Sequence, residues 1–215
     1  MAGFEFVRSI SGENDIPVEL QIKASATVAV GDALEFTSGK LGRVDAQDDV
    51  VKFVCLQAAV ATATSQTKVR VLPTVGKIFK VTHTPLVNDV AGVTNSTATT
   101  VKCALADGSS SDLVGGLVYC KELDQYRIIT ANTYSSDVVT ITVAEGFTRA
   151  VTTTDTVRIT AFGPGDAAVK LHGTNYHNSV SSVRGDEAGG KLVIRDITTS
   201  GARALKELFV EFLQA

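Results

Sequence analysis

Residues 26–44 read ATVAVGDALEFTSGKLGRV, and this stretch decides the fold class. Apolar and polar residues alternate on both sides of the Gly31-Asp32 pair, which predicts two short strands joined by a turn. Gly39 and Gly42 follow in TSGKLGRV and supply the backbone freedom that a hairpin turn needs. The stretch therefore predicts short, closely spaced strands.

The same pattern continues on both sides of this stretch. VELQIKA at 18–24, KVRVLP at 68–73 and GKIFKVTH at 76–83 all alternate, which is typical of a small barrel or sandwich. A polar connection rich in Thr and Asn is predicted from 84 to about 101, and further strands follow it. We expect an N-terminal arm at 1–17, a barrel at 18–83, a second β-rich region at 84–165, and a C-terminal hairpin and helix at 166–215.

One helix is predicted, at the C-terminal end of the chain. Ser200 is a suitable N-cap for SGARALKELFVEFLQA, and an apolar stripe recurs at the spacing i, i+3, i+4, i+7. The stripe consists of Leu205, Leu208, Phe209 and Phe212. It can pack on the protein's own sheet, or it can form a contact with another subunit.

Composition favours strands and excludes several classes of function. The 215 residues include 29 valines and 25 threonines, a quarter of the chain, and both types suit a pleated surface. A net charge of −3 gives no electrostatic reason to expect nucleic-acid binding. No stretch reaches the roughly 18 consecutive apolar residues of a membrane span. The first twenty residues lack a signal-peptide pattern, so we expect cytosolic synthesis.

The three cysteines and three histidines do not form a recognisable reactive site. Cys55, Cys103 and Cys120 are widely spaced in apolar runs, which predicts buried thiols and no disulfide framework. His172 and His177 lie five residues apart, a spacing that suits neither helical zinc ligands nor one face of a strand. His83 stands alone before a Thr-Pro turn. We therefore predict no metal, no cofactor and no catalytic residues, and a protein that is not an enzyme.

RGDEAGGKLVIRDI, residues 184–197, contains two motifs that need to be weighed. Gly185 to Lys191 matches the start of a nucleotide-binding P-loop, but Leu192 stands where the magnesium-binding Ser or Thr is needed. KLVIRDI alternates like a strand, whereas a P-loop requires a helix there. The glycines are better explained as the loop of a hairpin. The Arg184-Gly185-Asp186 tripeptide has only loop exposure to support an adhesive role.

Residues 22 to about 75 resemble the head decoration, or capsid cement, proteins of tailed bacteriophages. Gly31-Asp32 precedes a strand, Gly39 and Gly42 form a turn, DAQDDVVKFVCLQAAV at 45–60 leads from an acidic turn into an Ala-rich strand, and KVRVLP closes the run. The resemblance covers a quarter of the chain and implies a β-barrel of the type called a β-tulip. The fold class expected is therefore mostly β, with a β-tulip-like barrel, a further β-rich region and one amphipathic terminal helix.

The resemblance implies a structural virion protein that binds the outer surface of an icosahedral capsid and stabilises the junctions between capsomers. Its partner would be the major capsid protein, and homo-oligomers are expected, with trimers favoured and dimers as the alternative. The protein would be made in the bacterial cytoplasm and end on the capsid exterior. An alternative is a phage tail-tube or head–tail joining protein, for which the 84–100 segment could form a long stacking hairpin.

The N-terminal arm is the segment that the resemblance assigns to capsid binding. Phe4, Phe6, Val7 and Arg8 are the predicted contact residues, because an arm with alternating apolar side chains can pair with an edge strand of the shell. The alternative is that this arm forms a strand within the protein's own sheet.

Overall fold

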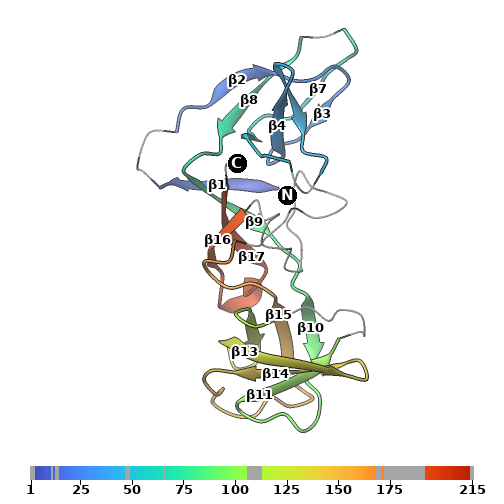
Figure 1. The fold of residues 1–215 in the computed structure, drawn as a ribbon, viewed down its shortest axis with the longest axis vertical. Coiled ribbons are helices and arrows are strands. Elements are labelled where there is room, and N and C mark those ends of the chain that lie inside the picture. The colour runs from blue at the N-terminus through green and yellow to red at the C-terminus, as the bar shows by residue number, and fades with distance from the viewer. Residues whose placement is uncertain are drawn as a thin grey trace.

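The computed structural model describes residues 3–10, 12, 15–46, 49–64, 66–105, 113–167, 171 and 192–213. The described chain is mostly β, as predicted, and contains no α-helix; Gly201–Arg203 forms a single 3-10 turn. Figure 1 shows three tiers along the long axis: a half-barrel at one end, a four-stranded middle sheet, and a six-stranded lower sheet at the other end.

The half-barrel is built from the stretch that decided the fold class. Its five antiparallel strands run in the order β2-β8-β6-β4-β5, and β3 pairs with β7 beside them. The strands are β2 (Val18–Gln21), β3 (Thr27–Val28), β4 (Ala33–Thr37), β5 (Lys40–Arg43), β6 (Phe53–Cys55), β7 (Ala59–Val60) and β8 (Lys68–Pro73). A parallel bridge between Ile22 and Leu41 brings the two ends of the sheet together.

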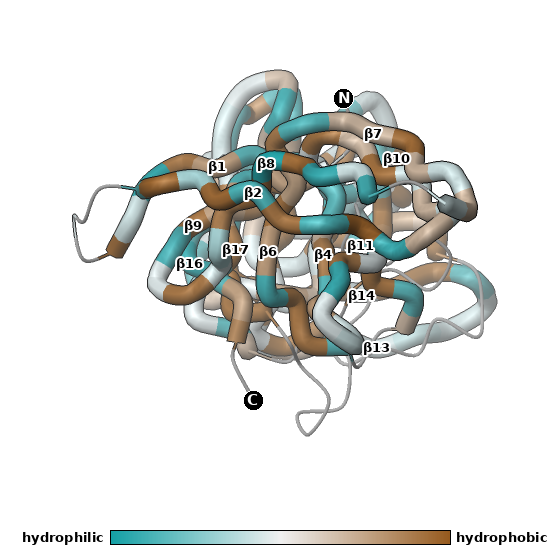
Figure 2. The backbone as a smooth tube through the Cα atoms, turned by 90° about the horizontal axis from the view of Figure 1, so that it is seen from above, coloured by the Kyte–Doolittle hydropathy of each residue, from teal (hydrophilic) through white to brown (hydrophobic). Residues whose placement is uncertain are grey.

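Both faces of the half-barrel sheet are buried. Cys55 and Val71 point into the core of the half-barrel, whereas their neighbours Val54 and Leu72 join the core of the rest of the molecule. Figure 2 shows hydrophobic and hydrophilic residues alternating along β2 and β8. The half-barrel is therefore packed onto the middle sheet through its second apolar face.

The turns predicted at Gly31-Asp32 and at Gly39 are confirmed, but Gly42, predicted in the second turn, lies within β5 and pairs with Glu35. Gly31 has φ 90°, and Ser38 and Gly39 have φ 53° and 78° between β4 and β5. A two-residue loop with positive φ at both positions is the hairpin turn whose twist matches antiparallel strands. Asp32 is buried, and its carboxylate accepts hydrogen bonds from the Ala29 amide at 2.7 Å and from Arg43 Nε at 2.6 Å.

The middle sheet gathers strands from distant parts of the chain. Its order is β1-β9-β17-β16, all antiparallel, with β1 (Phe4–Ser9), β9 (Lys77–Thr82), β16 (Leu192–Ile197) and β17 (Glu207–Phe212). The rings of Phe4 and Phe212 lie 4.9 Å apart, and that of Phe79 lies 5.5 Å from Phe212. An aromatic cluster therefore joins the first and last strands.

The lower sheet contains the longest strand, β13, which bends between two partners. The order is β10-β15-β12-β13-β14-β11, and the register of β13 shifts between Ile129 and Ala131. The strands are β10 (Val87–Ala91), β11 (Thr100–Ala104), β12 (Leu117–Cys120), β13 (Gln125–Ser135), β14 (Val138–Val143) and β15 (Thr156–Thr160). The segment predicted as a connection from 84 to about 101 thus contains β10.

The predicted C-terminal helix is wrong. Ser200 makes no side-chain cap, Leu205 has φ 57°, and residues 207–212 form β17 between β9 and β16. Leu208, Val210 and Phe212 alternate into the core, so the same sequence also carries a period of two. Pairing on both sides satisfies the backbone of β17 and buries this face, which outweighs the helical spacing.

Candidate interaction surface

The N-terminal residues predicted to contact the capsid lie on β1, at the edge of the middle sheet. β1 pairs with β9, so this segment forms a strand of the protein's own sheet, the alternative considered from the sequence. Phe4 is buried, and the ring of Phe6 lies 6.0 Å from that of Phe79. The register shifts between Phe6 and Arg8, so Val7 forms a bulge, and Val7 and Arg8 are exposed.

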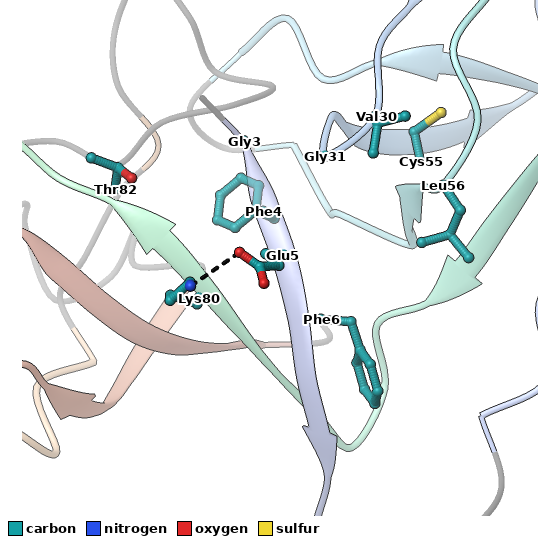
Figure 3. Close-up of a pocket in the computed structure, with 10 residues that line it drawn as sticks. All are labelled: Gly3, Phe4, Glu5, Phe6, Val30, Gly31, Cys55, Leu56, Lys80 and Thr82. Carbon is teal, nitrogen blue, oxygen red and sulfur yellow. Dashed lines mark ion pairs between the residues drawn. The ribbon is translucent and has the colours of Figure 1, made fainter. Parts of the chain in front are cut away.

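A pocket of about 430 Å³ lies between β1 and the half-barrel. Figure 3 shows β1 along one side and the half-barrel residues along the other, with the Glu5 carboxylate paired with Lys80 Nζ at 3.1 Å. The residues that line the pocket are Gly3, Phe4, Glu5, Phe6, Val30, Gly31, Cys55, Leu56, Lys80 and Thr82. The walls are thus mostly apolar, and the charged side chains near β1 neutralise each other.

Two glycines close one end of this pocket. The Phe4 amide donates a hydrogen bond to the Gly31 carbonyl at 2.8 Å. A Cβ atom on Gly31 would lie 3.1 Å from Gly3 Cα and 3.1 Å from the Phe4 nitrogen, closer than most side chains tolerate. Glycine is therefore favoured at position 31 for two reasons: the positive φ of the turn before β4, and the close approach of β1.

The residues predicted as a subunit contact lie mainly in the core of the chain itself. Leu205, Leu208 and Phe212 are buried with the middle and lower sheets, and Phe209 is half-buried on the other face of β17. Packing on the protein's own sheet is thus observed for these three. The helix that would have placed all four on one stripe is not formed.

Three potential metal ligands that no sequence motif indicated meet in the lower sheet. One ligand atom each from Cys120, Glu122 and Asp155 lies within 4.8 Å of the others. Both carboxylates already hold protein donors: Asp155 binds both terminal nitrogens of Arg149 at 2.6 Å, and Glu122 binds the Thr156 amide and hydroxyl. The group therefore fastens β12 to the turn before β15.

The protonation states in this cluster agree with a structural role. The guanidinium of Arg149, helped by the Thr152 amide, holds the pKa of Asp155 well below its usual range against the opposing effect of burial. Burial disfavours the charged form of Glu122, but the hydrogen bonds from Thr156 outweigh it and lower its pKa. Burial also raises the pKa of the Cys120 thiol, which leaves it a poor nucleophile and a poor ligand.

A buried arginine joins the lower sheet to the turn before β17. Arg158 Nε binds Asp89 at 2.6 Å, and its Nη1 donates to the carbonyls of Ala202 and Ala204 at 3.0 and 2.9 Å. Its guanidinium also lies 5.7 Å from the centre of the Tyr119 ring. Sequence reasoning missed these contacts, because the partners of Arg158 come from three separate segments of the chain.

The remaining sequence motifs are only partly within the described residues. His83 is buried with its ring 5.3 Å from that of Phe162. His172, His177 and the Gly-rich segment 184–191 lie outside the described residues, as does the strand predicted before that segment. Leu192 begins β16, which confirms that a strand and not a helix follows Lys191.

Two further findings bear on identity. No helix within the described residues is both long and apolar enough to cross a membrane. Comparison of the chain with protein-family models, with curated proteins and with solved structures finds no match.

Proposed function

We propose that this chain is a structural protein of a tailed-bacteriophage particle that binds the outer surface of the icosahedral capsid and stabilises capsomer junctions. One observation carries the proposal: residues 22–75, which resemble decoration proteins, fold as a half-barrel with the turns expected at Gly31 and Gly39. This half-barrel has its own core of eight buried residues. The resembling stretch therefore supplies this core and every strand of the half-barrel except β2.

Exposed apolar side chains near the end of β1 support a role in binding another protein. Ile16 and Val75 are 73% and 62% exposed, and Val7 and Ile10 are also exposed. The Ile10 amide donates to the Gly76 carbonyl at 2.8 Å, which brings Ile10 next to Val75. Exposed apolar side chains that are neighbours, as Ile10 and Val75 are, are typical of a contact surface. Of the residues predicted as capsid contacts, Val7 is one of these exposed side chains, and Arg8 follows it on β1.

A decoration role requires binding energy at many equivalent positions and no chemical reaction. Packaged DNA presses the shell outward, and each bound copy adds its interface energy at a junction. A homo-oligomer, with a trimer favoured over a dimer, would multiply this energy through avidity. The buried thiols suit such a passive role, since burial raises the pKa of Cys103 to about 12.

The direct test is to mix purified protein with expanded, undecorated capsids and with unexpanded capsids, and to image both by cryo-electron microscopy. We expect added density on the outer surface of the expanded shell. Absence of density from both kinds of capsid would overturn the proposal.

A tail-tube or head–tail joining protein is the second candidate, and one feature favours it. β13 (Gln125–Ser135) and β14 (Val138–Val143) form a long hairpin, closed by Ser136 and Asp137 with φ 50° and 60°. Tube subunits stack through such hairpins. Size-exclusion chromatography with light scattering separates the candidates: rings would favour the tube, and monomers to trimers the decoration role.

A further inference from the structure

We propose that the open edge of β1 and the pocket beside it accept a short extended segment of the shell protein, which adds a strand to the middle sheet. The inference rests on the proposed function, since it names where the shell protein would bind. It is carried by the backbone of β1, by the position of Gly31 and by the lining of the pocket.

The backbone of β1 presents hydrogen-bonding groups to the pocket. β1 is the last strand of its sheet, and among the described residues no strand pairs with its outer edge. The Phe4 amide points away from β9, because it donates to the Gly31 carbonyl. Residues two apart on a strand point the same way, so the main chain of Phe6 also faces this side. Phe6 lines the pocket.

Gly31 already makes the first contact that such an added strand would make. Its carbonyl accepts the hydrogen bond of Phe4 at 2.8 Å, which is the pairing expected from a neighbouring strand. The chain then turns at Gly31, with φ 90°, and enters β4 instead of continuing along β1. A bound segment would continue the pairing from Gly31 towards Phe6.

The size and chemistry of the pocket limit what can bind. From Phe4 to the bulge at Val7 is three residues of strand, or about 10 Å, and a bulge interrupts regular pairing. Phe6, Val30 and Leu56 form an apolar wall, while the Glu5–Lys80 ion pair leaves no net charge. The occupant expected is an extended segment of about three residues that directs an uncharged, apolar side chain at Leu56.

The test uses two matched substitutions in the full-length protein. Val30→Arg places a long charged side chain in the pocket wall, at a residue that is 44% exposed, so the arginine can reach solvent. Val60→Arg makes the same change on β7, at a residue that is 69% exposed and outside the pocket lining. Thermal unfolding of both variants checks that the fold is kept.

Binding to expanded, undecorated capsids is measured by co-sedimentation, and amide hydrogen exchange is followed at Phe6 and Val7. We expect Val30→Arg to weaken binding by at least about tenfold and Val60→Arg by less than about twofold. We also expect exchange at the Phe6 amide to slow when the wild-type protein is on the capsid.

The outcomes separate this inference from the proposed function. Equal binding by all three proteins, or an equal loss in both variants, overturns the pocket inference and leaves the decoration role standing. Unchanged exchange at Phe6 in the bound wild-type protein overturns strand addition. If the wild-type protein does not bind capsids, the decoration role fails first, and the shell protein is excluded as the occupant.

Discussion

The half-barrel and the lower sheet each have a buried aspartate immediately before a strand, but the hydrogen bonds to the two carboxylates differ. Asp32 precedes β4 and Asp155 precedes β15, and both side chains are 2% exposed. Each carboxylate accepts a hydrogen bond at 2.7 Å from the amide three residues earlier, Ala29 or Thr152. The same hydrogen bond, from a backbone amide to the aspartate three residues later, therefore closes the turn before the strand in both regions.

The difference lies in the number of charged contacts. Asp32 receives one bond from Arg43, at Nε, whereas Asp155 receives two from Arg149 and another from the Thr152 hydroxyl. Paired guanidinium contacts are stronger and fix the geometry of the carboxylate. We infer that the lower sheet depends more on its aspartate than the half-barrel does. Four predictions test or refine this comparison.

The largest effect is expected for Asp155→Ala. The substitution leaves the Thr152 amide and hydroxyl without their acceptor and Arg149 without its partner, which should lower the free energy of unfolding by about 3–4 kcal/mol. Urea unfolding followed by circular dichroism measures this change. A loss below about 1 kcal/mol would mean that solvent replaces the carboxylate.

Asp32→Ala should cost less, about 2 kcal/mol, because fewer charged hydrogen bonds are lost. Both variants remove a buried carboxylate that accepts an amide hydrogen bond at 2.7 Å, so the comparison between them isolates the effect of the additional side-chain hydrogen bonds of Asp155. If both lose the same free energy, the number of arginine contacts does not set the stability of these turns.

Effects no larger than that of Asp32→Ala are expected at two glycines of the half-barrel. Gly31→Ala forces a side chain into a positive-φ position and against β1, which should cost about 2 kcal/mol. Gly39→Ala has no atom within 4 Å of its Cβ, so only the strained φ remains, at about 1 kcal/mol. Thermal unfolding of both variants compares them. Equal losses would mean that the contact between Gly31 and β1 is not tight.

The last prediction is a dependence of stability on acid pH. Hydrogen bonds lower the pKa of Asp155 in the folded protein, so its stabilising effect is complete above the unfolded pKa of about 3.9. It is lost as the pH falls below that value towards the folded pKa. Asp155→Asn should therefore show a shallower loss of stability between about pH 4 and pH 2. Curves of the same slope for both proteins would contradict the assignment.

Sequence reasoning succeeded where the partners of a strand are close along the chain. The turns at Gly31-Asp32 and Gly39 and the strand that starts at Leu192 could be predicted, because glycine conformation and alternation act locally. The buried cysteines are also as expected. Local reasoning was less successful between 84 and 101, where β10 is short and polar. Its pairing with β15 depends on residues about seventy positions away.

The candidate site shows the same limit. Phe4 and Phe6 were identified from the alternation of FEFV, but nothing local revealed that β1 would pair with β9 and lie across from Leu56. The cluster at Asp155 and the contacts of Arg158 also join distant segments, so no spacing rule could locate them.

The sequence alone determined that this protein is mostly β and where the half-barrel turns fall. It also showed that no stretch reaches the roughly 18 consecutive apolar residues of a membrane-spanning helix. Only the tertiary structure decided that residues 4–9 and residues 207–212 both form strands that pair with β9. LFVEF, residues 208–212, fits both a helical stripe and an alternating strand, and two neighbouring strands selected the second. Backbone pairing on both sides and burial of Leu208, Val210 and Phe212 together favour the strand, and neither effect is visible in a single segment.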